Sequence, residues 1–358
     1  MQFLQTEIPY VCPATRVSLH PDGGLLKADR DVVAYPVRDG IPNFLRFGAA
    51  PEFDDADEFN RLNAAARTEG WRAALQQVYG AKAPGMVRYV TETGRTSFIE
   101  LLGLRADDDV LEIGPGLGQV TTVLARRVRS LCALEVVPGQ AEYVSHRCMQ
   151  EGLSNVRVAV GGDDCRLPYA DGSFDAVVLN LVFEWCASRC ADEDPVAVQR
   201  RLLDEMARVL RPGGTLYLAT KNRYALKYLI GKHDEHMHHL RFGSALPRWL
   251  SRLALRRKGL PRAPGLLHSY GALANMLRDA GFDSLRSYWA VPEVRYPTEY
   301  VPTDAESVHQ ARRREGFVQS EGRSTRLLMR WVPAAWVRQV APGLAFLARK
   351  GSSHGGSL

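Results

Sequence analysis

The pattern of hydrophobic and polar positions along the chain changes character near residue 109. Beyond it, short apolar runs alternate with helix-like segments of about 10 to 15 residues. This alternation predicts βαβ units, and nearly continuous apolar runs are typical of parallel strands buried on both faces. We therefore expect a doubly wound α/β fold. The predicted strands are residues 110–113, 131–137, 156–160, 176–182, 215–220, 285–291 and 343–349.

The segments on either side of this regular region differ in composition. The first residues combine a Pro-Asp-Gly-Gly turn at 21–24 with short extended runs, which predicts a small β module. Apolar positions at helical spacing follow, and the final residues are rich in Gly and Ser. The expected division is a β module at 1–46, a helical segment at 47–104, an α/β domain at 105–350 with insertions at 221–268 and 293–342, and a disordered tail at 351–358.

Composition favours a soluble globular protein. Hydrophobic residues make up 46% of the chain, an ordinary fraction. Apolar runs, such as 176–183 with its single interruption at Asn180, are far shorter than the roughly 20 residues that a membrane-spanning helix needs. The first residues lack the basic and apolar regions of a secretion signal. The six cysteines are scattered, which fits reduced thiols better than a disulfide framework. We expect a cytoplasmic protein without a transmembrane segment, and its oligomeric state stays open.

A basic stretch at residues 241–262 holds seven Arg or Lys and no Asp or Glu. Such a stretch suits an anionic substrate, a nucleic acid or a membrane surface, or it is a solvated helix face balanced by acids elsewhere. Leu246, Trp249, Leu250 and Leu253 recur at helical spacing. We expect this helix to cover the mouth of an active site with its apolar side and to show its cations outward. We expect no tight RNA binding.

A glycine-rich loop, Glu112-Ile-Gly114-Pro-Gly116-Leu-Gly118, lies between the first predicted strand and its helix. Glycines there let the backbone turn tightly and approach a ligand, and the helix N-terminus offers free N–H groups. Nucleotide-binding dehydrogenases have a similar loop, so further features must decide the ligand. The carboxylate of Glu112 would repel a pyrophosphate, but it suits the cationic amino-acid portion of S-adenosylmethionine.

Two more carboxylate positions follow the next two predicted strands. Glu135 ends the second strand, where a carboxylate can accept hydrogen bonds from both ribose hydroxyls. Asp163 and Asp164 follow the third strand, where an aspartate can accept from the exocyclic amine of adenine. The order of these positions along the chain favours S-adenosylmethionine over a dinucleotide.

Residues 108–220 resemble the class I S-adenosylmethionine-dependent methyltransferases. The resemblance rests on the glycine loop, on GDDCRLPYADGSFD at 162–175 and on VLRPGG at 209–214. It implies a Rossmann-like, mostly parallel, seven-stranded sheet with helical insertions. Positions 112 and 135 carry Glu where Asp is commoner, which leaves the charge unchanged. The resemblance implies Glu112, Gly114, Gly116 and Gly118 around the methionine moiety, Glu135 on the ribose, Asp163 and Asp164 at the adenine, and Asn180 lining the pocket.

The first 46 residues resemble a small zinc-ribbon-like module that some methyltransferases carry and that also exists as a separate partner protein. That family binds zinc through two Cys-x-x-Cys pairs. Here only Cys12 remains, Thr15 stands in the place of the second cysteine, and no second pair precedes Tyr35. We expect no zinc, and a structural or partner-contact role for the module.

Acceptor specificity is expected in the two insertions, because ligands of this fold bind at the carboxyl ends of the strands. His236 lies in a cluster of His, Asp and Glu at 233–239, which could be a solvated loop, a substrate contact or a metal site. No regular ligand spacing stands out, so we expect no metal. His236 and His268 are the candidates for a base, although His268 could simply precede a helix N-cap at Ser269. Trp185 could stack on a planar substrate or pack in the core.

The leading hypothesis is a methyltransferase that acts on oxygen or nitrogen of a small molecule, such as a secondary metabolite or a saccharide-like acceptor. Two long insertions with aromatic and histidine content favour it. The basic stretch and the zinc-ribbon-like module favour an alternative, an rRNA or tRNA methyltransferase. A third hypothesis is a scaffold that keeps the fold without catalysis, and the intact cofactor motifs argue against it.

Overall fold

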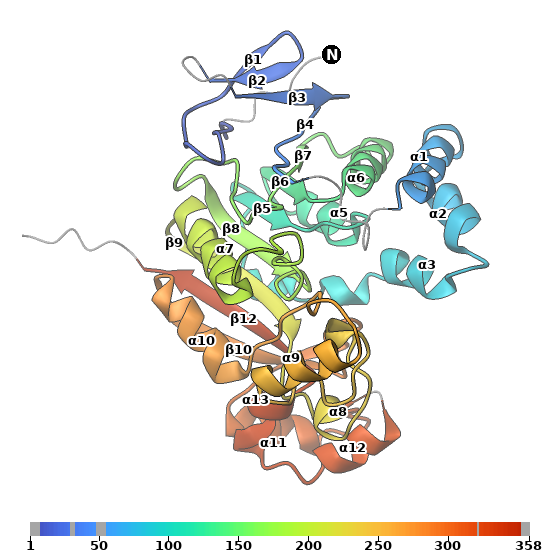
Figure 1. Cartoon of the computed structure of the whole chain (residues 1–358), viewed down its shortest axis with the longest axis vertical. Coiled ribbons are helices and arrows are strands. Elements are labelled where there is room, and N and C mark those ends of the chain that lie inside the picture. The colour runs from blue at the N-terminus through green and yellow to red at the C-terminus, as the bar shows by residue number, and fades with distance from the viewer. Residues whose placement is uncertain (1–7, 29–32, 48–54, 321, 352–358) are drawn as a thin grey trace, which may run out of the picture. The chain divides into compact units, whose positions relative to one another are not determined.

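The computed structural model describes residues 8–28, 33–47, 55–320 and 322–351. Figure 1 labels its helices and strands, and the chain divides into two compact units. The first is Met1–Val178 with Arg208–Gly214, and the second is Leu179–Ala207 with Thr215–Leu358. These boundaries differ from the predicted ones at residues 46 and 104, and the predicted division stays a prediction. The predicted disorder at 351–358 falls, apart from Gly351, outside the described residues.

The core of the first unit is a sheet with the order β8-β5-β6-β7, in which β5, β6 and β7 run parallel. Leu111 of β5 pairs with Cys132 of β6, and Cys132 pairs with Arg157 of β7, in parallel register. Every residue of β5 and β6 is buried, as expected for strands covered on both faces. The elements are β5 (Asp109–Ile113), α5 (Gln119–Ala125), β6 (Ser130–Glu135), α6 (Pro138–Gln150), β7 (Val156–Val160) and β8 (Phe174–Asn180).

The helices before β5 pack against the loop that follows it. Trp71 and Phe59 join Leu117 and Tyr143 in one buried cluster. The Tyr143 hydroxyl donates to the Trp71 carbonyl at 2.8 Å, and the Arg147 guanidinium lies 3.9 Å from the Trp71 ring centre. These helices therefore support the glycine loop from outside. They are α1 (Ala56–Glu69), α2 (Trp71–Tyr79), α3 (Pro84–Thr91), the 3-10 helix η1 (Gly94–Thr96) and α4 (Ile99–Leu102).

The chain begins with a four-stranded antiparallel sheet in the order β1-β2-β3-β4. Its strands are short because turns at Gly23-Gly24 and Gly40 reverse the chain with positive φ. Asn43, just past β4, bridges to Val160 at the end of β7. The predicted β module is confirmed. Its strands are β1 (His20–Asp22), β2 (Leu25–Lys27), β3 (Ala34–Arg38) and β4 (Ile41–Pro42).

The second unit holds strands in the order β9-β12-β10-β11, and each neighbouring pair is antiparallel. Together with the four strands of the first unit's order β8-β5-β6-β7, this makes eight strands instead of the expected seven. The additional strand is β11, which pairs with β10 through Tyr300 and Ala290. Strand β9 begins at Leu210 rather than at Thr215, and Gly213 takes a φ of 75° inside it. The strands are β9 (Leu210–Lys221), β10 (Phe282–Val291), β11 (Glu299–Pro302) and β12 (Gly343–Lys350).

The helices of the second unit include α10, which follows the expected N-cap Ser269. The Ser269 hydroxyl accepts from the Ala272 N–H at 3.4 Å. No helix among the described residues is long and apolar enough to cross a membrane. None of the six cysteines, which all lie among the described residues, forms a disulfide bond. The remaining elements are α7 (Pro195–Val209), α8 (Leu226–Leu229), η2 (Glu235–Met237), α9 (Arg248–Arg257), α10 (Tyr270–Asp279), α11 (Ala305–Arg313), α12 (Arg323–Met329), η3 (Ala334–Trp336) and α13 (Val337–Val340).

Candidate active site

The glycine loop of the first unit adopts a backbone that only glycine takes easily. Gly114, Gly116 and Gly118 have φ values of 74°, 57° and 79°. The Gly114 N–H donates to the Leu134 carbonyl at 2.9 Å, which fixes the loop to β6. Gly118 leads directly into α5. The loop thus presents backbone close to any ligand at this edge of the sheet.

Glu112 is a buried carboxylate without full compensation. Its side chain is almost fully buried, and Oε2 has no hydrogen-bond partner. Burial raises the pKa of this carboxyl to about 7, the Glu135 charge adds to the rise, and contacts with Thr121, Arg95 and Arg147 oppose it. A buried acid in this state gains most from a cationic ligand group placed beside it.

Glu135 holds the glycine loop in place. Its Oε2 accepts from the Gly116 N–H at 3.0 Å, and Oε1 accepts from the N–H groups of Val136 and Val137 at 2.8 and 3.0 Å. A carboxylate can accept about four hydrogen bonds, so these three leave little spare capacity. Glu135 is therefore a structural brace of the loop, whatever else it contacts.

The two aspartates after β7 also have protein partners. Asp163 accepts from the N–H groups of Arg46 and Phe47, at distances of 2.6 to 3.1 Å. Burial raises its pKa, and these two N–H groups oppose the rise. Asp164 accepts from the backbone and side chain of Arg166 at 3.0 and 2.8 Å. Asp163 thus fastens the end of the β module to the end of β7.

Two polar residues that the sequence did not single out lie at the same loop. Both amide atoms of the Gln119 side chain are buried and lack hydrogen-bond partners, as does Nε of Arg95. Arg95 is close enough to Glu112 to lower its pKa. Gln119 could have been noticed as the first residue of the helix after Gly118. Arg95 carries no signal, because it belongs to no motif and lies in the short 3-10 helix that precedes β5.

The buried polar atoms without hydrogen-bond partners show whether the site suits the expected cofactor. An unpaired carboxylate at Glu112, an unpaired amide at Gln119 and a cation at Arg95 match the ammonium and carboxylate groups of an amino-acid ligand. The residues present therefore fit the amino-acid portion of S-adenosylmethionine.

The remaining expected cofactor residue, Asn180, belongs to the second unit, at the end of β8. Its Oδ1 is buried and has no hydrogen-bond partner. The next residue, Leu181, has a φ of 60° and donates its N–H to the Ala219 carbonyl at 2.8 Å. The strand therefore turns sharply at its carboxyl end and leaves the Asn180 amide oxygen uncommitted.

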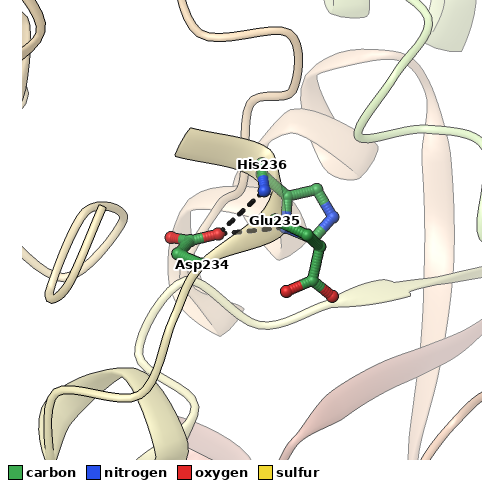
Figure 2. Close-up of side chains that lie close together, drawn as sticks. All are labelled: Asp234, Glu235 and His236. Carbon is green, nitrogen blue, oxygen red and sulfur yellow. Dashed lines mark hydrogen bonds and ion pairs between the residues drawn. The ribbon is translucent and has the colours of Figure 1, made fainter. Parts of the chain in front are cut away.

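His236 lies in a buried cluster of polar side chains (Figure 2). Asp234 Oδ1 accepts from the His236 backbone N–H at 3.0 Å and lies 3.2 Å from Nδ1. The other ring nitrogen, Nε2, has no hydrogen-bond partner and lies 3.9 Å from Glu184 Oε1. The Trp185 ring centre is 4.6 Å from that of His236. Asp234 orients the imidazole, and Trp185 covers it.

Asp234, Glu235 and His236 bring possible metal-ligand atoms within 4.8 Å of one another. Most of these atoms already have partners. Asp234 Oδ2 accepts from the Ser244 N–H at 2.8 Å, and Glu235 pairs with Lys221 and with Lys227. Burial raises the pKa of Glu235, but the two lysines outweigh it and bring the value to about 2. Two ammonium groups beside the cluster disfavour a further cation, and the expectation of no metal stays a prediction.

His268 has a defined tautomer. The Gln199 Nε2 group donates to the carbonyls of Phe183 and Leu266, each at 3.0 Å, so its Oε1 must accept. Oε1 is 2.7 Å from His268 Nε2, which therefore carries the proton. Nδ1 then accepts from Arg248 Nη2 at 3.4 Å. Burial lowers the pKa of His268 to about 3, and the charge of Arg248 contributes, so the ring stays neutral.

The basic helix differs from the expectation in its apolar side and agrees with it in its cations, because Arg252, Arg256 and Arg257 are exposed. In α9, Trp249 is 66% exposed and Leu253 is also exposed, whereas Ser251 and Leu255 are the buried residues. Arg248, Arg252 and Arg256 line a pocket within the second unit. The Ser251 hydroxyl donates to the Gly243 carbonyl at 2.7 Å and helps to set this rotation. The helix therefore turns a row of arginines toward a pocket and part of its apolar side toward solvent.

Comparison with known proteins identifies the central segment. Residues 111–218 match the family model described as a methyltransferase domain. The biotin biosynthesis bifunctional protein BioHC of Cellvibrio japonicus is 33% identical over 111 residues, which are 31% of this chain and 19% of that protein. The demethylmenaquinone methyltransferase of Tropheryma whipplei is 31% identical over 122 residues, which are 34% of this chain and 45% of that protein. The chain thus spans less than half the length of these relatives.

Among solved structures, the phosphoethanolamine N-methyltransferase 1 of Haemonchus contortus, in complex with phosphoethanolamine and S-adenosylhomocysteine, is 15% identical with a TM-score of 0.44. The alignment covers 84% of this chain and 50% of that one. The family match shows a methyltransferase domain at residues 111–218, within the segment whose motifs resemble the class I S-adenosylmethionine-dependent methyltransferases. The zinc-ribbon-like character of the β module is not confirmed.

Proposed function

We propose that this protein transfers a methyl group from S-adenosylmethionine to oxygen or nitrogen of a small molecule. The observation that carries the proposal is the buried, unpaired Oε2 of Glu112 at the positive-φ glycine loop. The match of residues 111–218 to the methyltransferase domain family supports it. We also propose a cytoplasmic location, which the lack of a disulfide bond among the six described cysteines supports.

The roles of the cofactor residues follow from their chemistry. S-adenosylmethionine, when bound, supplies a methyl group activated by a positively charged sulfur. Glu112 and the loop glycines would hold its methionine moiety, with Gln119 and Arg95 beside them. Glu135 would meet the ribose while it braces Gly116, Asp163 and Asp164 would lie at the adenine, and Asn180 would line the pocket. Holding two reactants in line can contribute about 7–11 kcal/mol, so positioning is the main task of the protein.

A base is needed only where the accepting group must lose a proton. His236 remains the proposed base, because its Nε2 is uncommitted and Asp234 orients the ring. In the described structure His236 is fully buried, so this role requires that Trp185 or its neighbours move. His268 is proposed instead as a positioning residue for Arg248, because both of its nitrogens are engaged.

The proposal can be tested with S-adenosylmethionine labelled in its methyl group. The purified protein is incubated with a small-molecule extract and, separately, with bulk RNA, and label is followed into each fraction. We expect transfer to small molecules and none to RNA. Transfer to RNA alone would support the rRNA or tRNA alternative. Binding of the cofactor without transfer to either fraction would support the scaffold alternative.

A further inference from the structure

The second unit contains a pocket of about 570 Å³, a size typical of small-molecule sites. One wall is formed by residues 187–195, which come after β8, and another by Arg223, two residues beyond the end of β9. Residues 243–267, including α9, supply most of the rest. The pocket therefore lies beyond the carboxyl ends of strands, where ligands of α/β folds bind.

Three arginines of α9 line this pocket at a spacing of four residues. Arg248, Arg252 and Arg256 lie on one helix face, and α9 contains no Asp or Glu to offset them. Arg252 and Arg256 have no hydrogen-bond or ion-pair partner among the residues that the structure describes. Like charges four residues apart on a helix repel each other and destabilise it, so a bound anion would reduce this repulsion.

Two of the arginines at the pocket, Arg223 and Arg248, are held in fixed positions. Arg223 donates to the carbonyls of Ser244 and Leu246, each at 2.7 Å. Arg248 is oriented by His268, and its Nε is buried without a partner. Burial lowers the pKa of Arg248, and the charges of Arg223 and Arg252 lower it further. The pocket thus contains two fixed guanidinium groups, and one of them has a buried donor without a partner.

Acidic residues at the pocket do not cancel these charges. Five arginines line it against three acids, Asp192, Glu193 and Asp194. Glu193 pairs with Arg201 at 2.8 Å, and Asp194 accepts from the Ala197 N–H at 3.2 Å at the start of α7. Asp192 and Asp194 are exposed to solvent. Arg252 and Arg256 are exposed as well, and five arginines against three acids leave a net positive charge at the pocket.

We propose that this pocket binds the methyl acceptor through an oxyanion, either a carboxylate or a phosphate, held by Arg252 and Arg256 with Arg248 behind them. The guanidinium fork matches both groups in a bidentate manner. This proposal rests on the proposed function and adds to it the chemical class of the acceptor. The apolar lining from Leu255, Leu260 and Leu267 would contact the remainder of the molecule.

The test uses the full-length protein and three aromatic probes, phenyl phosphate, benzoate and the neutral benzamide, titrated by calorimetry. The variant Arg252→Gln/Arg256→Gln removes two pocket charges. The matched control Arg257→Gln removes a charge from the same helix at a position that does not line the pocket. S-adenosylhomocysteine binding is measured on every protein as a separate readout of the first unit.

We expect an oxyanion probe to bind the wild type and benzamide not to bind. The double variant should weaken that binding about tenfold or more, and Arg257→Gln less than twofold. Stronger binding of phenyl phosphate than of benzoate would identify a phosphate, and the reverse a carboxylate. Equal binding of benzamide, an equal loss in Arg257→Gln, or displacement of the probe by submicromolar tRNA would overturn the proposal. Absent S-adenosylhomocysteine binding with the probe pattern intact would contradict the proposed function alone.

Discussion

The two units build their candidate sites by different means. In the first, one local sequence motif carries the site: Gly114, Gly116 and Gly118 take left-handed backbone angles between two buried strands, and Glu112 lies beside them. In the second, insertions form a pocket from irregular chain and one short helix, and arginines supply its chemistry. A motif therefore identifies the first site, whereas only the folded chain reveals the second.

The largest effect on stability is expected for a substitution behind the glycine loop of the first unit. Trp71→Ala removes a buried side chain that packs with Leu117, Tyr143 and Arg147 behind the glycine loop. The resulting cavity should lower the free energy of unfolding of the first unit by about 3–5 kcal/mol. Urea unfolding followed by circular dichroism measures this change. A loss below about 1 kcal/mol would show that α1 and α2 do not support the loop.

The second prediction concerns the pH dependence of the cofactor site. The raised pKa of Glu112, about 7, means that the ligand-free fold favours the protonated acid. The fold therefore loses stability as the pH rises from the ordinary pKa near 4.5 toward 7. A cationic ligand needs the ionised form, so affinity for S-adenosylhomocysteine should rise about tenfold between pH 6 and pH 8. Calorimetry at several pH values measures it, and Glu112→Gln should remove the rise. A rise of equal size in that variant would assign the titration to another group.

The third prediction tests the neutral state of His268 in the second unit. With its pKa lowered to about 3, the ring should keep the Nε2–H tautomer throughout pH 5 to 8. Protonation in the unfolded chain below about pH 6.5 then favours unfolding, so this residue costs stability as the pH falls. Nitrogen-15 NMR, with His268→Gln to assign the signal, should show no titration in this range. A midpoint near 6.5 would contradict the contacts with Arg248 and Gln199.

The smallest effect is expected for Trp249→Ala in α9. This side chain is 66% exposed, so its loss should change the free energy of unfolding by no more than about 0.5 kcal/mol. Trp71→Ala is the same substitution at a buried position, so the difference between the two losses in the free energy of unfolding reports the difference in burial. A loss of several kcal/mol at Trp249 would show that the apolar side of α9 is covered after all.

The elements that the sequence predicts correctly are those whose conformation depends on residues nearby in the chain. Strands β5 to β7 and the glycine loop depend on neighbours in the chain, so periodicity and turn chemistry locate them. The partners of Asp163 could not be predicted, because Arg46 and Phe47 are more than a hundred positions away. The prediction of which side of α9 is buried was wrong for a related reason. Amphipathic spacing finds an apolar face but not what packs on it, and here Ser251 and Leu255 face inward.

The central claim is that the glycine loop and its carboxylates bind the cofactor, and calorimetry with S-adenosylhomocysteine tests it most directly. The wild type should bind, and Glu135→Ala should lose most of its affinity, because both the loop brace at Gly116 and the proposed ribose contact disappear. Arg257→Gln, in the other unit, should bind as the wild type does. A folded Glu135→Ala protein with undiminished affinity, or a wild type that does not bind at all, would contradict the account.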